Sequence, residues 1–336
     1  MSLLQPPSGQ PLGPLRSFAR VLRKRAKRLR SYFMWSYLRL RNVAARQSVT
    51  GPTPVVVSLT TYGRRIDAAA VAVESIARGS IKPSRIILWL DNPSLYANRP
   101  AALRRLEYRG LEILLTDNLG PHTKYFPYVG SVKEHLLPLV TADDDIMYPK
   151  YWLRKLHRSY LENPTSINCH WASTILLSGD RVGSYHTWPN CRTSAPGFSN
   201  FGLGVSGVIY PPGMLAELAR QGTAFRELSP TADDVWLHWV ALRAGYPVRQ
   251  IASTPRHFAL IPGTQAQALM TTNNVEGAGN DAWIGRLYSE SDRSKIYSAI
   301  SVVPGSAVVG AVGQSQDLSP GVVGRGPCLP VDAMFD

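Results

Sequence analysis

The sequence predicts an α/β protein built on a mostly parallel sheet flanked by helices. Short apolar runs, VVVSLT from Val55, RIILWLD from Arg85 and LEILLT from Leu111, alternate with amphipathic stretches near residues 67–78 and 99–108. Apolar strands separated by such helices are typical of parallel sheets that are buried on both faces. Ligands of these sheets bind beyond the carboxyl ends of the strands. The polar residues that follow each strand are therefore the first candidates for a functional site.

The second half of the chain continues this pattern less regularly. GVSGVIY, which ends at Tyr210, and PVRQIA, which begins at Pro247, predict strands, and TADDVWLHWVALRAG predicts a helix between them. We expect one α/β domain over residues 51–295, preceded by a basic segment over residues 1–50. Residues 296–336 are rich in glycine and low in charge, and they predict a flexible tail.

The net charge of +14 is concentrated at the N-terminus. Residues 1–66 hold 13 of the 37 Lys and Arg residues and none of the 23 acidic residues. The remaining chain is almost balanced, which argues against nucleic-acid binding by the folded domain, and no nucleic acid is expected as a partner. Cys169, Cys191 and Cys328 have no metal-ligand spacing and are too few for a disulfide framework, so the cytoplasm is the expected compartment.

A basic amphipathic helix is predicted over residues 16–46, which contain eleven Lys or Arg residues and no acid. An apolar stripe at helical spacing is formed by Phe18, Val21, Leu22, Ala26, Leu29 and Phe33. Such a helix suits an anionic membrane surface, and the alternative is that the stripe packs on the main domain. Because no apolar run is long enough to cross a bilayer, we expect a peripheral protein on the inner face of the cell membrane.

Three consecutive acids follow an apolar run in LVTADDDIMYP. Neighbouring carboxylates repel one another, and such a cluster is stable where a cation offsets the repulsion. In an extended strand end, Asp143 and Asp145 would point to one side and Asp144 to the other, so the first two could hold Mg²⁺ or Mn²⁺. The alternative is an acidic turn or an N-cap for the next helix.

Four motifs follow one another between residues 54 and 288. They are VVVSLTTYGRRI, DNLGPHTKYFP, TADDDIMYP, and GVSGVIYPPG with the later TADDVWL. Together they resemble those of nucleotide-sugar-dependent glycosyltransferases of the GT-A fold, similar to glycosyltransferase family 2 and related bacterial enzymes. The resemblance implies a Rossmann-like GT-A domain and a metal-bound nucleoside diphosphate sugar as donor.

The resemblance also implies roles for individual residues. Those expected near the nucleotide or its phosphates are Thr60, Tyr62, Arg64, Asp91, Lys124 and Asp144. Asp143 and Asp145 would hold the metal, and His257 is a further candidate ligand, although a lone histidine is more often structural. Lys124 has an equally simple interpretation as a solvated loop residue.

The acidic pair Asp233 and Asp234 has two interpretations. In the family, such a pair supplies the base that takes the proton from the acceptor hydroxyl, and this base is usually the second member of the pair. The resemblance therefore favours Asp234, with Asp233 as the close alternative. Thr231 and Asp234 also match a capping box at a helix start, which is a purely structural use.

These observations predict a metal-dependent glycosyltransferase of the hexosyltransferase type, inverting by analogy with the family, which acts on a lipid-linked or cell-envelope glycan acceptor. A metal-dependent nucleotidyltransferase and a non-catalytic sugar-binding protein on the same fold are the alternatives. The sequence lacks the phosphate-binding loop G-x-x-x-x-G-K-[ST], so a P-loop kinase is disfavoured.

Overall fold

A seven-stranded sheet forms the centre of the computed structural model, which describes residues 14–179, 181–264 and 279–301. The strand order is β12-β6-β11-β4-β1-β2-β3, and in this sheet β11 runs antiparallel to both of its neighbours while the other pairs are parallel. The strands are β1 (Thr53–Thr61), β2 (Pro83–Leu90), β3 (Leu111–Leu115), β4 (Leu139–Thr141), β6 (Ile167–Cys169), β11 (Val208–Tyr210) and β12 (Val248–Gln250). The predicted α/β class with a mostly parallel sheet is confirmed.

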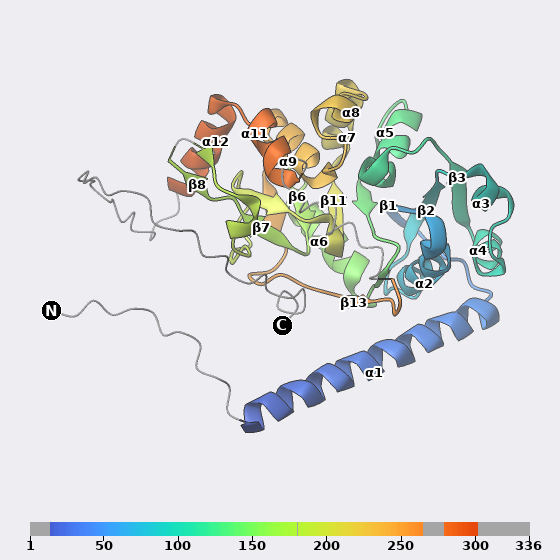
Figure 1. The fold of residues 1–336 in the computed structure, drawn as a ribbon. Helices are drawn as coiled ribbons and strands as arrows, with labels where there is room; N and C mark the ends of the chain where they lie inside the picture. The colour runs from blue at the N-terminus through green and yellow to red at the C-terminus, as the bar shows by residue number, and fades with distance from the viewer. Residues whose placement is uncertain (1–13, 180, 265–278, 302–336) are drawn as a thin grey trace.

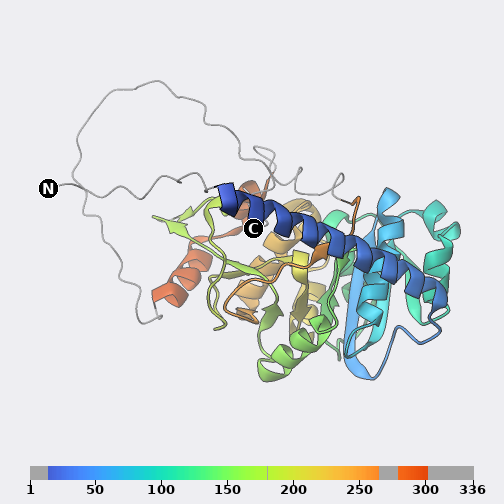
Figure 2. The same ribbon diagram turned by 90° about the horizontal axis from the view of Figure 1, so that it is seen from below.

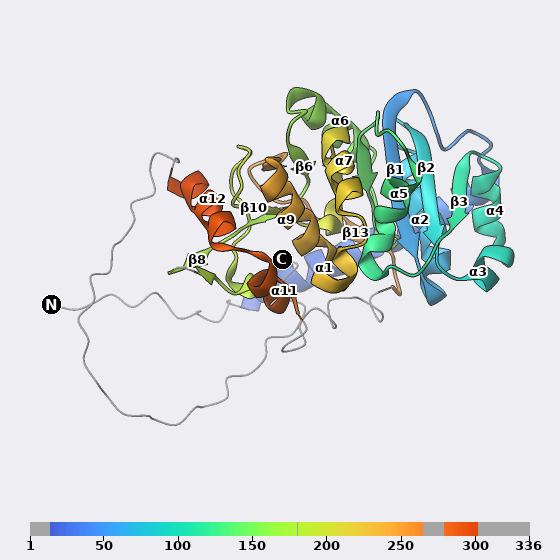
Figure 3. The same ribbon diagram turned by 90° about the horizontal axis from the view of Figure 1, so that it is seen from above.

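Helices cover both faces of this sheet (Figures 1 and 3). Alternate residues of β1 point to opposite faces, so Val55, Val57 and Leu59 join one buried cluster and Val56 joins the other. The first face is covered by α2 (Ile66–Ala77), α4 (Ala101–Glu107) and α6 (Trp152–Glu162). The second is covered by α5 (Phe126–Ser131), α7 (Pro212–Gln221), α8 (Phe225–Leu228), α9 (Asp233–Ala244) and α11 (Asn280–Leu287).

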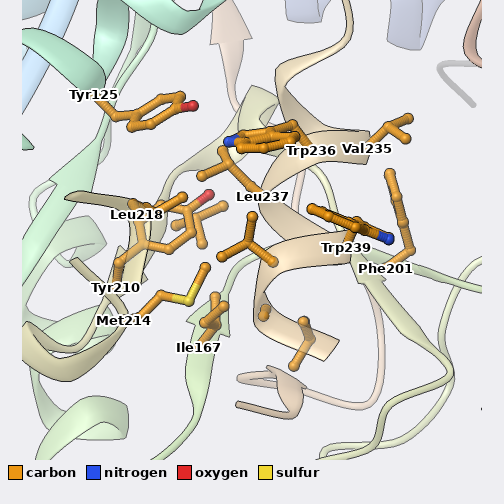
Figure 4. Packing of buried hydrophobic residues seen from close by; sticks show 14 of the residues in the cluster. Tyr125, Ile167, Phe201, Tyr210, Met214, Leu218, Val235, Trp236, Leu237 and Trp239 are labelled. Atoms are coloured by element: carbon orange, nitrogen blue, oxygen red, sulfur yellow. The ribbon is translucent and has the colours of Figure 1, made fainter. Parts of the chain in front are cut away.

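Helix α9 is buried along most of its length, and its apolar residues pack against several elements of the second face (Figure 4). The partners in this cluster include Ile167, Phe201, Tyr210, Met214 and Leu218. Trp236 and Trp239 belong to this core. Because the helix is enclosed, its first residues, Asp233 and Asp234, are held in a defined position.

Shorter elements complete the described chain. Three two-stranded ribbons pair β5 (Ile146–Met147) with β13 (Ala259–Leu260), β7 (Ala172–Thr174) with β10 (Asn200–Gly202), and β8 (Leu177–Ser178) with β9 (Arg181–Val182). The other short elements are α3 (Pro93–Ala97), η1 (Gly63–Arg65), η2 (Gly120–Lys124), η3 (Tyr185–Thr187) and η4 (Gly204–Ser206). Helix α12 (Glu290–Ser301) continues past residue 295, and the rest of the predicted tail lies outside the described residues.

The predicted basic helix is α1 (Pro14–Ala44), which lies along the outside of the domain (Figures 1 and 2). It docks through Leu38, with Met34 and Trp35, against α2 and the β5–β13 ribbon. Leu22, Leu29 and Phe33 are 48%, 59% and 69% exposed. The alternative in which this stripe packs on the domain is therefore wrong, because a different face of the helix makes the contact.

The side chains of Phe18 and Val21, which the same stripe includes, lie outside the described residues. Among the described residues, none of the helices has both the length and the apolarity needed to span a bilayer.

A buried ion-pair network fixes the C-terminal half of α1. The carboxylate of Glu74, on α2, is fully buried and lies 3.0 Å from Arg41 Nε of α1 and 2.7 Å from Arg109 Nη1. A buried carboxylate requires such compensation, because its transfer out of water costs several kcal/mol. Glu74 therefore ties α1 to the body of the domain.

Replacing Glu74 by Gln should lower the free energy of unfolding by about 3–5 kcal/mol, because two largely buried guanidinium groups lose their partner. Urea unfolding followed by tryptophan fluorescence measures this change. The matched control is Glu112→Gln, whose partner Arg85 and own side chain are more than one-third exposed. That control should cost about 1 kcal/mol or less. Equal effects of the two substitutions would show that the Glu74 network does not hold α1.

Candidate active site

The three consecutive acids fill the connection between β4 and β5 and do not form an extended strand end. The expected separation of Asp144 from Asp143 and Asp145 does not hold, because one guanidinium, that of Arg65, contacts both Asp144 and Asp145. A turn changes the chain direction, so the period of two that orders side chains along a strand is lost. None of the three acids caps the next helix, whose N-cap residue is Tyr151.

Asp144 and Asp145 are neutralised only in part. Thr61 Oγ1 donates to Asp144 Oδ2 at 2.6 Å, Arg65 donates to Asp144 Oδ1, and Arg65 Nη2 lies 2.8 Å from Asp145 Oδ2. Burial nevertheless raises the pKa of Asp144 to about 7. Burial and the charge of Asp143 raise the pKa of Asp145 to about 6. A further cation beside these carboxylates would relieve the unfavourable burial of negative charge, so the donor set suits a divalent ion.

Lys124 joins the acidic turn to the start of α9. Its Nζ lies 3.4 Å from Asp143 Oδ1 and 3.3 Å from Asp233 Oδ2. Burial opposes the charged ammonium, but the three surrounding carboxylates outweigh this effect, and the pKa of Lys124 lies well above its usual value. The interpretation of Lys124 as a solvated loop residue is therefore wrong.

The backbone that carries Lys124 is fixed to the sheet. Ser58 Oγ, on β1, donates to the Lys124 carbonyl at 2.7 Å and accepts from Trp89 Nε1, on β2, at 2.9 Å. These hydrogen bonds fix the backbone of Lys124 to the central strands β1 and β2.

Asp234 completes the cluster from the first turn of α9. The backbone N–H of Gly204 points to both of its carboxylate oxygens, each at 3.2 Å. A Cβ at position 204 would lie 3.1 Å from Asp234 Oδ1 and 3.4 Å from Lys124 Nζ, so glycine permits this close approach. Burial and the charge of Asp233 raise the pKa of Asp234 to about 7, against the opposing effect of Lys124.

The capping-box interpretation of the TADD segment is wrong. The N-cap residue of α9 is Ala232, and no side chain caps this helix. Thr231 is exposed, and its hydroxyl accepts a hydrogen bond from Trp283 Nε1 at 3.0 Å. The loop before α9 is held by tertiary contacts, which the local pattern T-x-x-D cannot reveal.

His122 provides one of these tertiary contacts. Its ring is buried and stacked on Phe225, with Nε2 2.8 Å from the Ser229 carbonyl and Nδ1 2.9 Å from Tyr125 Oη. Since a carbonyl only accepts, Nε2 carries the proton and Nδ1 accepts from the tyrosine hydroxyl. His122 therefore connects the segment of Lys124 to the loop that leads into Asp233.

Among the other predicted residues, Thr60, Tyr62 and Asp91 lie at the carboxyl ends of β1 and β2. Thr60 Oγ1 donates to the Trp89 carbonyl at 3.2 Å, and Tyr62 receives a long hydrogen bond of 3.5 Å from Arg65 Nη1. Asp91 follows the last residue of β2. The side chain of Arg64 lies outside the described residues.

His257 is exposed, and its ring meets the edge of Trp171 with 3.7 Å between the centroids. Within the part of the chain that the structure describes, no three or more His, Cys, Asp or Glu side chains are grouped so that they could hold a metal ion. The assignment of His257 as a metal ligand remains a prediction.

Sequence reasoning missed Thr61 and Arg65 and named their neighbours Thr60 and Arg64. The signal was present, because a threonine pair and an arginine pair both stand in TTYGRR. Thr61 is the last residue of β1, and strand alternation places its side chain on the opposite side from that of Thr60. Arg65 reaches Asp144 from the 3₁₀ turn of η1, and this turn was not predicted.

Comparison with solved structures gives distant similarities. No protein-family model and no curated protein matches the chain. One similar structure is a mannosyltransferase from Pyrobaculum calidifontis in complex with GDP-Man and Mn²⁺, with 12% identity, 75% of this chain and 70% of that chain covered, and a TM-score of 0.41. A second is CMP:2-keto-3-deoxy-manno-octonic acid synthetase complexed with CTP, with 11% identity, 66% of this chain and 99% of that chain covered, and a TM-score of 0.39. A third is S. aureus TarS, with 12% identity, 59% of this chain and 58% of that chain covered, and a TM-score of 0.40. Similarities of this size do not decide function, which must be inferred from the site.

The contribution of His122 to stability should fall on acidification. Burial lowers the pKa of His122 to about 4, below its unfolded value of about 6.5, so the neutral ring stabilises the fold above the unfolded pKa. This stability is lost as the pH falls towards 4, by about 2 kcal/mol between pH ~7 and ~5. Urea unfolding at the two pH values, compared between the unsubstituted protein and a variant without this imidazole, isolates the contribution.

A His122→Gln variant should be less stable near neutral pH but should lose less stability on acidification. His186→Gln, at an exposed position, is the control and should behave like the unsubstituted protein. An unchanged pH dependence in His122→Gln would contradict the assignment.

Proposed function

We propose that this protein transfers a sugar from a nucleoside diphosphate sugar to a hydroxyl group, with Mg²⁺ or Mn²⁺ as cofactor. The observation that carries the proposal is the meeting of Asp143, from the acidic turn, with Asp233 and Asp234, from the start of α9, around Lys124. Sugar transfer requires two functions at one place, a cation for the leaving diphosphate and a base for the acceptor hydroxyl. The two acidic groups match these functions.

Asp143 and Asp145 are the residues that we assign to the cation. Two carboxylates completed by water and phosphate oxygens suit Mg²⁺ and Mn²⁺. The charge of Asp143 is one of the causes that raise the pKa of Asp145, so the two carboxylates lie within electrostatic reach of each other. A bound ion would neutralise the charge that develops on the departing diphosphate.

Asp234 is the residue that we assign to proton transfer. The acceptor oxygen forms a bond to the anomeric carbon as the bond from that carbon to the diphosphate oxygen breaks. The electron pair leaves with the diphosphate, and the hydroxyl proton passes to Asp234. A pKa of about 7 suits a base that works near neutral pH. Asp233, buried against Lys124, would position the ammonium, and a single displacement of this kind inverts the anomeric centre.

The donor nucleotide would lie beyond the carboxyl ends of β1 and β2, where Thr60, Tyr62, Arg64 and Asp91 are found. Lys124 is a further candidate for contact with its phosphates, whereas Asp144 is buried and its two carboxylate oxygens accept from Thr61 and Arg65. For the acceptor we propose a lipid-linked or cell-envelope glycan at the inner face of the membrane, for the reasons given in the next section.

Incubation with UDP-, GDP- and dTDP-sugars should release nucleoside diphosphate in the presence of Mg²⁺ or Mn²⁺. Asp143→Asn and Asp145→Asn should abolish metal-dependent donor binding, measured by calorimetry, and leave the fold intact, because each removes one of several clustered negative charges. The matched control is Glu134→Gln, at an exposed position. Release of pyrophosphate from a nucleoside triphosphate would establish the nucleotidyltransferase alternative, and donor binding without turnover would indicate a non-catalytic protein.

Asp234→Asn should lower kcat by about 100-fold or more with little change in donor affinity, because a general base acts only in the transition state. In the unsubstituted protein, turnover should fall as the pH drops below about 7, where Asp234 gains a proton and cannot act as a base. The profile of kcat against pH measures this. Asp233→Asn, at the adjacent acid, is the comparison. A larger loss in Asp233→Asn than in Asp234→Asn would reverse the two assignments.

A further inference from the structure

Helix α1 presents an apolar face that the domain does not cover. We call this face the outer stripe; its residues are 48% to 69% exposed and comprise Leu22, Leu29, Phe33, Tyr37, Leu40 and Val43. Successive spacings of seven, four, four, three and three residues keep them on one side of a helix with 3.6 residues per turn. Leu38, which is fully buried, lies on the opposite side. The helix therefore has one face for the domain and a second apolar face for another partner.

Basic residues border the outer stripe on both sides. Arg23 and Arg30 lie along one side of the stripe and Arg25 and Arg39 along the other, and all four are exposed. No acidic residue occurs in α1. The combination of an apolar stripe with purely basic borders is complementary to a surface that is apolar inside and anionic outside.

The position of α1 leaves this face accessible along the helix. Viewed from below, α1 crosses in front of the rest of the fold (Figure 2). With 31 residues it is about 46 Å long. We propose that the outer stripe inserts into the headgroup region of an anionic lipid bilayer, with α1 parallel to the membrane plane.

Charge and chemistry favour lipid over two other occupants. A second copy of this chain, packed stripe against stripe, would bring two purely basic borders together, and like charges repel. A nucleic acid would engage the arginines but would leave Leu29, Phe33 and Leu40 exposed to water. A bilayer satisfies both parts of the surface.

The docked face of α1 connects the membrane to the candidate active site. Leu38 belongs to the same buried cluster as Met147 and Ile261. Met147 is two residues beyond the acidic turn, and the Ile261 N–H donates to the Asp145 carbonyl at 2.7 Å. A membrane-bound α1 would thus hold the acidic turn one packed layer from the bilayer. An acceptor with a lipid anchor follows from this placement, and only this consequence rests on the proposed transfer reaction.

Sedimentation of the full chain with vesicles tests the proposal. The protein should bind vesicles of phosphatidylcholine with about 30 mol% phosphatidylglycerol and should bind phosphatidylcholine alone much more weakly. The variant Leu29→Gln/Phe33→Gln/Leu40→Gln should reduce binding by about tenfold or more, because Gln has nearly the helix propensity of Leu but no apolar surface to insert. Circular dichroism of this variant confirms that the helix content is retained.

The control variant is Leu136→Gln/Leu161→Gln, which changes two exposed leucines outside α1 and should bind vesicles like the unsubstituted protein. The proposal would be overturned if the unsubstituted protein stayed in the supernatant when the anionic vesicles sediment, or if the triple variant bound these vesicles equally well.

A dimer of the unsubstituted protein in sedimentation velocity that is absent in the triple variant would show instead that the stripe contacts a second copy. Binding to a DNA duplex, equal in both proteins and without vesicle binding, would assign the basic residues to nucleic acid. The vesicle assay contains no sugar donor, so its result does not depend on whether the protein catalyses the proposed transfer reaction.

Discussion

A lysine ammonium holds the two acidic groups of the candidate active site together. Lys124 lies between Asp143 and Asp233, which come from the acidic turn and from the start of α9. Without the positive charge these carboxylates would repel one another in a region largely removed from water, where the repulsion is strong. The hydrogen bond from Ser58 to the Lys124 backbone fixes this charge to the sheet. The relative position of the proposed metal ligand and the proposed base therefore depends on one side chain.

Other buried acids of this fold also depend on nearby cations that offset their charge. Arg65 compensates Asp144 and Asp145, and two arginines compensate Glu74 beneath α1. The difference is quantitative. Glu74 has more cations than it needs, whereas the active-site acids outnumber Lys124 and Arg65, and burial raises the pKa of several of them. The remaining negative charge is what makes the site suitable for a divalent ion and a phosphate-bearing donor.

Helix α1 shows that one helix can serve two apolar contacts. Its buried face, centred on Leu38, docks on α2 and on the ribbon beside the acidic turn, and its outer stripe remains exposed. An amphipathic pattern alone reports that a helix has an apolar side but not which partner covers it. The docked face accounts for the ordered contact with the domain, and the outer stripe leaves a surface for a second partner.

The sequence by itself determined the α/β sheet, the two acidic groups and the basic helix, because apolar periodicity and charge clustering are local properties of the chain. Tertiary structure alone decided that Arg65 meets Asp144, that Lys124 is enclosed by carboxylates, and that Thr231 does not cap α9. These outcomes depend on turn geometry and on where distant segments meet. Local patterns carry no information on either, because side-chain partners are set by the packing of the whole domain.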